Sequence, residues 1–309
     1  MNSKASKLPA TDINASGFIG VFDSGIGGLS VLQALRAEMP QERFVYWADS
    51  GYAPYGERSD AFVIERSHFI TQELLSQGPV KAIVVACNTA TAVAIEALRA
   101  RYPQLPFIGV EPALKPALAQ TQTLRVGVMG THGTLRSQRF EKLRQSVLTD
   151  GAPKSCEFVM QACKGLALAI EQQTEKAIDD TQALTALCAH HVQSMGTFGT
   201  ASGQIDTLVL GCTHYVFVQD ILRKLVGPNV NIISTGDAVA KQAQRLMAKS
   251  FGSMPVKDSQ GNVQLWTTGS LHALHAAASR WLDLSADHCH QVITSSTVSA
   301  VSTSTRTSD

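Results

Sequence analysis

Short apolar runs rich in β-branched residues alternate along this chain with longer segments in which apolar residues recur every three or four positions. The first pattern is typical of buried strands and the second of amphipathic helices. Strand-like runs cover residues 18–22, 44–48, 82–86, 107–110, 125–129, 156–160, 207–210, 231–234 and 263–267. Strands and helices that alternate in this way predict an α/β fold with mostly parallel strands.

Several predicted helices have recognisable ends. Apolar residues over 29–39 lie on one helix face, and Pro40 ends that helix because proline cannot continue it. A second helix is predicted over 61–76, and a third follows Cys87. Residues 191–204 contain three glycines and several Ser and Thr residues, so we expect a long loop there.

Two pairs of segments resemble one another. The strand and turn at 20–25 resemble those at 127–133, and the turn at Cys87 resembles the turn at Cys212. The separations within the two pairs are similar, which indicates two related α/β halves. Halves that face each other would bring both cysteines to one cleft.

The composition is that of an ordinary globular enzyme, with 44% hydrophobic and 17% charged residues. A formal net charge of +1 gives no electrostatic basis for nucleic-acid or membrane binding. The N-terminus has no signal-peptide pattern, and no run of about 18 apolar residues suggests a membrane span. The sequence therefore predicts a cytoplasmic protein with polar, disordered tails at 1–16 and 286–309.

Two of the six cysteines stand out. Cys87 and Cys212 each end an apolar run and precede small polar residues. A thiol there lies at the carboxyl end of a parallel sheet, where open α/β folds bind ligands, and a following helix N-terminus favours the thiolate. Two such thiols suggest a site with one sulfur on each face of a substrate carbon. The alternative, a small buried hydrophobic residue, suits the remaining cysteines, Cys156, Cys163, Cys188 and Cys289.

Other polar residues near strand ends are further candidates. His214 either fills its turn or exchanges a proton with the neighbouring cysteine. Asp23 lies in a glycine-rich turn, where it either caps the next helix, binds a substrate ammonium group or assists a thiol. Glu111 also follows a strand, either as a helix start or as a carboxylate near the cleft. The aromatic loop at 46–56 is expected to form one wall of a pocket.

Four motifs carry a resemblance to a known family. They are Phe22-Asp23-Ser24-Gly25-Ile26-Gly27-Gly28-Leu29-Ser30-Val31-Leu32, Tyr55-Gly56-Glu57-Arg58-Ser59, Ala86-Cys87-Asn88-Thr89-Ala90 and Gly211-Cys212-Thr213-His214-Tyr215. In this order and at these separations they resemble glutamate racemases, of the aspartate/glutamate racemase superfamily. The resemblance runs from about Phe18 to Leu282. Because these enzymes work without a cofactor, it implies that no cofactor and no metal are needed.

The resemblance also implies an architecture and a set of site residues. It implies two pseudo-symmetric, doubly wound domains, 17–111 with 227–285 and 112–226, with the active site at their interface. The implied catalytic residues are Cys87, Cys212, Asp23 and His214, the last two as supports for the thiols. The implied substrate-binding residues are Asp23, Ser24, Tyr55, Gly56, Asn88, Thr89, Thr131, Thr213 and His214.

The implied activity is the conversion of L-glutamate to D-glutamate for peptidoglycan, and thus for cell wall biogenesis and cell shape. Inversion at Cα without pyridoxal phosphate requires one thiolate to remove a proton while a thiol on the other face delivers one. Glutamate is the expected partner, and a homodimer is an open alternative to a monomer. Three other functions stay open: a racemase for aspartate or another amino acid, a Cys–His hydrolase using Cys212 and His214, and a non-catalytic amino-acid-binding protein.

Overall fold

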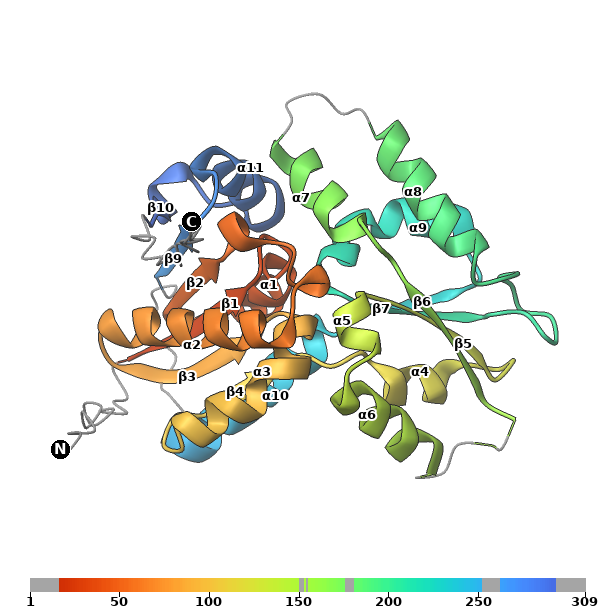
Figure 1. Cartoon of the computed structure of the whole chain (residues 1–309), viewed down its shortest axis with the longest axis horizontal. Helices are drawn as coiled ribbons and strands as arrows, with labels where there is room; N and C mark the ends of the chain where they lie inside the picture. Colours follow the sequence, from red (N-terminus) through yellow and green to blue (C-terminus); the bar gives the residue numbers. More distant parts are fainter. Residues whose placement is uncertain (1–16, 150–152, 154, 176–180, 252–261, 293–309) are drawn as a thin grey trace, which may run out of the picture.

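The computed structural model describes residues 17–149, 153, 155–175, 181–251 and 262–292. The predicted tail at 1–16 and the predicted tail from residue 293 onwards lie outside the described residues. Within them, the strands form a six-stranded and a four-stranded sheet, drawn on the left and on the right of Figure 1. Each pairing between these strands is parallel, which confirms the predicted fold class.

The first half of the molecule is the six-stranded sheet with its helices. Its strands lie in the order β10-β9-β2-β1-β3-β4. They are β1 (Phe18–Asp23), β2 (Phe44–Ala48), β3 (Val80–Val85), β4 (Phe107–Gly109), β9 (Val263–Thr267) and β10 (Cys289–Gln291). The helices are α1 (Leu29–Glu38), α2 (Asp60–Ser76), α3 (Asn88–Arg101), α10 (Gly236–Phe251) and α11 (Leu271–Leu282), with the short 3-10 helices η1 (Ser50–Tyr52), η2 (Tyr55–Glu57) and η4 (Ala286–His288).

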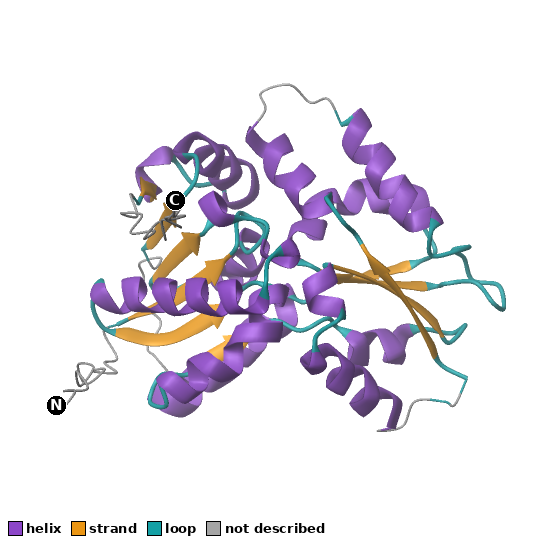
Figure 2. Cartoon of the chain, viewed as in Figure 1, coloured by secondary structure: helices purple, strands orange, loops and turns teal. Residues whose placement is uncertain are grey.

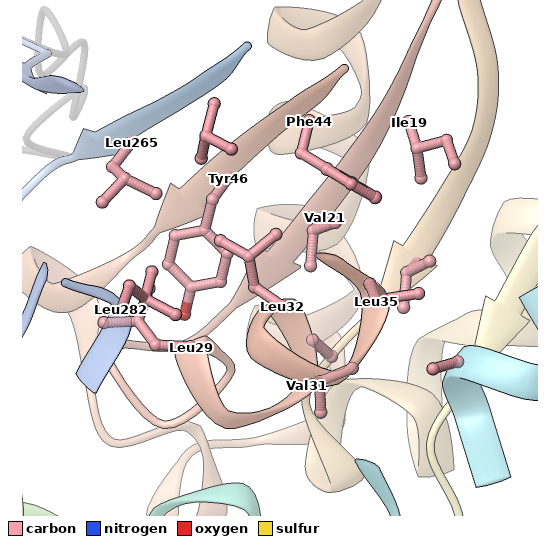
Figure 3. Close-up of a cluster of buried hydrophobic side chains, with 14 of the residues drawn as sticks. Ile19, Val21, Leu29, Val31, Leu32, Leu35, Phe44, Tyr46, Leu265 and Leu282 are labelled. Atoms are coloured by element: carbon pink, nitrogen blue, oxygen red, sulfur yellow. The ribbon is translucent and has the colours of Figure 1, made fainter. Parts of the chain in front are cut away.

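Helices cover both faces of this sheet, as Figure 2 shows. Ile19 and Val21 of β1 pack with α1, α10 and α11, while Phe18 and Phe22 pack with α2 and α3. Figure 3 shows the first of these cores, in which Leu32 of α1 lies beside Val21. Each such side chain contributes about 1.5–3 kcal/mol when fully buried. Burial on both faces explains why the strands read as continuous apolar runs.

The second half is the four-stranded sheet with its helices. Its strands lie in the order β6-β5-β7-β8 and are β5 (Arg125–Gly130), β6 (Glu157–Ala162), β7 (Thr207–Gly211) and β8 (Asn231–Ile233). The core on one face includes residues of α4 (Leu114–Gln120) and α6 (Gln138–Thr149). The core on the other face includes residues of α7 (Leu166–Glu175), α8 (Gln182–Gln193), η3 (Thr213–Val218) and α9 (Gln219–Val226). A one-turn helix, α5 (His132–Leu135), follows β5.

The two halves share one topology. The order β2-β1-β3-β4 in the first sheet corresponds to β6-β5-β7-β8 in the second. Strand β3 therefore corresponds to β7, and the residues that follow these strands include Cys87 and Cys212. The predicted pseudo-symmetry is present in the strand order, and it places the two cysteines at equivalent strand ends.

Three local expectations differ from the structure. Strand β8 pairs with β7, so the chain returns to the first half after Ile233 and not at residue 227, because this apolar segment extends the second sheet. Residues 289–291 form β10 on the edge of the first sheet, so the predicted tail at 286 begins too early. Helix α8 continues to Gln193, which shortens the loop expected at 191–204.

The chain passes between the halves twice. It leaves the first half after β4 and returns to it between β8 and α10, which packs on α1. The carboxyl ends of the strands in both sheets point toward the space between the halves, where the polar turns that follow these strands meet (Figure 1). No helix in the part of the chain that the structure describes is long and apolar enough to cross a membrane.

Candidate active site

Cys87 lies between the end of β3 and the first turn of α3. Its side chain is 5% exposed, and its Sγ accepts a hydrogen bond from the N–H of Ala90 at 3.5 Å. The thiol also approaches the hydroxyl of Ser24, with 3.8 Å between Sγ and Oγ. Burial raises the pKa of Cys87 well above its ordinary value, and the negative charge of Asp23 raises it further. Cys87 is therefore a thiol near neutral pH.

Cys212 occupies the equivalent position after β7, but its surroundings differ. The next residues form the 3-10 helix η3, and the α-helix expected at this turn begins only at Gln219. The Sγ of Cys212 lies 3.8 Å from Nδ1 of His214. The Nε2 of His214 lies 2.7 Å from Oε2 of Glu171. Burial alone would lower the pKa of His214, but its hydrogen bonds to Cys212 and Glu171 raise it well above its usual value.

Asp23 links the two cysteine turns. This carboxyl group is fully buried at the end of β1, and its Oδ2 accepts the N–H of Gly28 at 2.7 Å. Burial raises the pKa of Asp23, whereas the positive charge of His214 opposes that rise. The charge of Asp23 thus raises the pKa of Cys87 in the same half, and the charge of His214 in the other half acts on the pKa of Asp23.

The glycine-rich turn after β1 allows the halves to come this close. A Cβ atom at Gly27 would lie 2.3 Å from Nδ1 of His214, so a side chain at this position would collide with the imidazole. A charge on Cys212 also raises the pKa of Cys87, which is a further sign that the two thiols are near each other. The structure therefore brings Asp23, His214 and both cysteines to one interface.

Threonine hydroxyls from both halves form a second polar cluster beside the cysteine turns. Oγ1 of Thr89 lies 2.9 Å from Oγ1 of Thr131, which in turn lies 2.9 Å from Oγ1 of Thr134. A Cβ atom at Gly56 would lie 2.6 Å from that of Thr131, so the Gly56 backbone abuts the second half. Gly56 and Thr131 also line a cavity of about 430 Å³ between the halves, together with Lys164.

Three further predicted binding residues are buried at the cysteine turns. Asn88 donates a hydrogen bond from Nδ2 to the carbonyl of Val110 at 3.4 Å, and its buried Oδ1 has no partner among the described residues. Thr213 is 4% exposed and its carbonyl accepts the hydroxyl of Ser30 at 3.3 Å. Ser24 is 5% exposed beside Cys87. The structure gathers these residues with the thiols.

Tyr55 departs from the others. Its side chain is 1% exposed, and its hydroxyl donates a hydrogen bond of 2.5 Å to Oδ2 of Asp49, inside the first half. The phenol is thus engaged with the protein interior. Its backbone lies at the start of η2, where the Tyr55 carbonyl accepts the N–H of Arg58 at 3.0 Å.

A family model described as Asp/Glu/Hydantoin racemase matches residues 29–243. The chain belongs to this family. Among similar sequences, the glutamate racemase of Ectopseudomonas mendocina is 43% identical over 260 residues, which cover 84% of this chain and 92% of the relative. The glutamate racemase of Pseudomonas aeruginosa is 44% identical over 253 residues, covering 82% of this chain and 89% of the relative.

Solved structures of racemases share the fold. Glutamate racemase isoform RacE1 from Bacillus anthracis has a TM-score of 0.74 at 31% identity, covering 91% of this chain and 98% of that one. Escherichia coli glutamate racemase was solved with L-glutamate and the activator UDP-MurNAc-ala. It has a TM-score of 0.73 at 26% identity, covering 89% of this chain and 98% of that one. The predicted resemblance and the predicted enzyme class, an isomerase, are confirmed.

The racemase motifs gave no indication of Glu171. This residue of α7 reaches across to the first half, where its two carboxylate oxygens each lie 3.1 Å from the backbone N of Ile26. It also accepts the hydroxyl of Ser50 at 2.7 Å, in addition to its contact with His214. Glu171 and Ile26 are 145 residues apart, and no local pattern marks a glutamate within a helix. Only the folded chain makes this partnership visible.

Glu111, the other predicted carboxylate at a strand end, is paired with an arginine of the second half. Glu111 forms an ion pair of 2.7 Å with Arg139 of α6, so its carboxylate is engaged between the halves. Among the described residues, no three His, Cys, Asp or Glu side chains are grouped so that they could hold a metal ion. The interface itself carries thiols, hydroxyls, one imidazole and the carboxylates of Asp23 and Glu171.

Proposed function

We propose that this chain interconverts L-glutamate and D-glutamate by moving a proton at Cα between Cys87 and Cys212, without a cofactor. One observation carries the proposal. The two thiols lie at equivalent strand ends of two halves that face each other, so each half supplies one sulfur to the same interface. The relatives named glutamate racemase indicate the substrate.

The proton transfers balance in this scheme. The thiolate of Cys212 takes the Cα proton and becomes a thiol, while the thiol of Cys87 delivers a proton to the opposite face and becomes a thiolate. The amino acid keeps its composition, and the reverse reaction uses the exchanged roles. The surroundings fit this starting state because the raised pKa of Cys87 keeps its proton. The raised pKa of His214 places an imidazolium 3.8 Å from the other sulfur.

The carbanion needs charge stabilisation from the interface. The cluster of hydroxyls at Thr89 and Thr131 and the free N–H groups at the start of α3 are suited to hold the substrate carboxylate as negative charge develops. The unpartnered Oδ1 of Asn88 is suited to accept a hydrogen bond from the substrate ammonium group. These contacts strengthen when the Cα proton leaves, which lowers the barrier.

In the cell, this activity would supply D-glutamate to peptidoglycan and thereby support the cell wall and cell shape. The reaction needs both sulfurs free, which suits the reducing cytoplasm. A Cys–His hydrolase would use Cys212 and His214 but would leave Cys87 at the equivalent position without a role. The geometry therefore supports racemisation over acyl transfer.

The test is to incubate the purified protein with L-glutamate in deuterated water, with no added cofactor. We expect the optical rotation to fall to zero and deuterium to appear at Cα, followed by circular dichroism and by NMR. L-aspartate in a parallel sample should react far more slowly. Retention of the Cα proton and of optical activity with glutamate would exclude the proposed reaction.

A further inference from the structure

A buried carboxylate in the first half holds the wall of the interface that carries Gly56. Asp49 directly follows β2 and is fully buried. Its Oδ1 accepts hydrogen bonds from Arg66 Nη2 at 2.8 Å and from Thr268 Oγ1 at 3.0 Å. Its Oδ2 accepts them from Arg66 Nε at 2.9 Å and from the Tyr55 hydroxyl at 2.5 Å. Four donors converge on this one group, which makes it a rigid anchor.

Arg66 of α2 is the charged partner of this anchor. It binds Asp49 through two parallel hydrogen bonds, and its side chain is 11% exposed. Its guanidinium also lies over two aromatic rings, 3.7 Å from the centroid of Tyr52 and 4.5 Å from that of Phe69. A planar cation that makes two hydrogen bonds and stacks on rings cannot be replaced by the single ammonium group of lysine.

The anchor extends from the interior to the interface. The N–H of Asp49 donates to the carbonyl of Asp23 at 3.0 Å, which ties the loop after β2 to the catalytic turn after β1. The Tyr55 hydroxyl ties the other end of the loop, and Gly56 follows directly against Thr131 of the second half. The position of the Gly56 backbone is therefore set from behind by Asp49 and its donors.

We propose that Arg66 is a positioning residue for substrate binding. Acting through Asp49 and Tyr55, it holds the Gly56 backbone at the distance from Thr131 that the substrate carboxylate requires. In this assignment Tyr55 serves through its anchored backbone, while its phenol belongs to the interior. The inference rests on the proposed racemisation of glutamate and adds the part of the fold that sets its binding wall.

The decisive variant is Arg66→Lys, which keeps the charge but loses the paired hydrogen bonds and the stacking. Because Arg66 does not contact the thiols, the loosened wall should weaken ground state and transition state alike. We expect KM for both enantiomers to rise about tenfold while kcat stays within about threefold of the wild type. Both constants are measured by circular dichroism in each direction.

The matched control is Arg144→Lys on α6. Arg144 also forms a two-bond pair with a carboxylate, with 2.9 Å and 2.7 Å to Glu141, but on the surface. This variant should leave KM and kcat unchanged.

A second test variant is Thr268→Val, which removes one donor from Asp49 and the acceptor for the N–H of Gly51. It should raise KM about threefold with little change in kcat.

The outcomes separate positioning from a purely structural role. A lower melting temperature of Arg66→Lys with wild-type KM, or a fall in kcat alone, would overturn the assignment. If Arg66→Lys does not fold, Thr268→Val decides: a raised KM supports the proposal and an unchanged KM overturns it. A wild-type protein that does not racemise glutamate would instead remove the proposed function, so the two failures are distinguishable.

Discussion

The turns that carry Cys87 and Cys212 have equivalent places in the two halves but opposite electrostatic surroundings. After β3, Cys87 directly precedes a 14-residue α-helix and lies near the buried acid Asp23. After β7, Cys212 directly precedes a 3-10 helix and lies beside His214, whose other ring nitrogen contacts Glu171. The backbone topology is repeated, whereas the charges are not.

This difference matters for the proposed two-thiol reaction, which needs one sulfur that carries a proton and one that does not. Two sulfurs in identical surroundings would tend to be both protonated or both charged. In this protein, burial and the charge of Asp23 raise the pKa of Cys87 and keep its proton, whereas Cys212 has an imidazolium beside it. The pseudo-symmetry thus supplies equivalent positions, and the local differences place charges of opposite sign beside the two sulfurs.

Replacing either sulfur should have the largest effect. Cys87→Ala and Cys212→Ala each remove one of the two proton carriers, so we expect racemisation to fall by ~10³-fold or more in both. The initial rate is measured by circular dichroism from each enantiomer. Near-wild-type turnover in either variant would mean that racemisation does not need both sulfurs.

Removing the imidazole should have the next largest effect. His214→Asn leaves Cys212 without its cationic neighbour, and we expect kcat to fall about 100-fold. Because the pKa of His214 is raised, the imidazolium is present at neutral pH and is lost as the pH rises through that value. The alkaline decline of kcat/KM that reflects this loss should disappear in the variant. A pH profile parallel to that of the wild type would assign the decline to another group.

Neutralising Glu171, which contacts His214, should have a smaller effect than removing the imidazole. Glu171→Gln keeps the shape of the side chain but removes the charge that helps to raise the pKa of His214. We expect a roughly tenfold lower kcat/KM and an alkaline decline that begins at lower pH. Glu141→Gln on the surface of α6 is the control and should leave the profile unchanged. An unshifted profile in Glu171→Gln would separate this carboxylate from the function of His214.

The halves also differ at the amino ends of the equivalent strands β3 and β7, where we expect substitutions to leave the activity unchanged. The start of β3 carries Lys81, buried in an ion pair of 2.7 Å with Glu42. Before β7, Asp206 instead accepts hydrogen bonds from the Thr121 hydroxyl and the Thr123 backbone. Burial alone would raise the pKa of Asp206, but these hydrogen bonds lower it.

Asp206→Asn should therefore lower the free energy of unfolding by about 2 kcal/mol at pH 7, with kcat unchanged. A depressed folded-state pKa stabilises the fold above the unfolded value of about 3.9, and this contribution is lost as the pH falls through the folded value. The difference between variant and wild type should then narrow below about pH 4, as measured by urea unfolding. A constant difference across this range would contradict the assignment.

Local patterns predicted much of the fold because its central strands are covered on both faces and read as apolar runs. The strands at 44–48 and 263–267 have the predicted bounds. The short edge strands were harder to place. Residues 289–291 lie in a polar stretch and form a strand only because β9 offers its open edge, and β8 joins the second sheet through pairing that no local signal encodes.

The candidate site could be predicted where its residues sit in motifs at strand ends, as Cys87 and Cys212 do. The partners of these residues could not. Glu171 reaches Ile26 from 145 residues away, and Asp49 meets Thr268 from 219 residues away. Such contacts depend on how the halves and the loops pack in three dimensions, which sequence periodicity does not specify.

The double passage of the chain between the halves has a consequence for substrate traffic. Because two peptide connections join the halves, we expect any opening of the interface to be a rotation about these connections. Such a rotation would break exposed contacts between the halves, such as the Arg136–Asp60 ion pair of 3.4 Å. Breaking an exposed ion pair costs at most about 1 kcal/mol. The bonds of Glu171 to Ile26 and Ser50 also join the halves and are less exposed, so we expect this carboxylate to oppose opening of the interface more strongly.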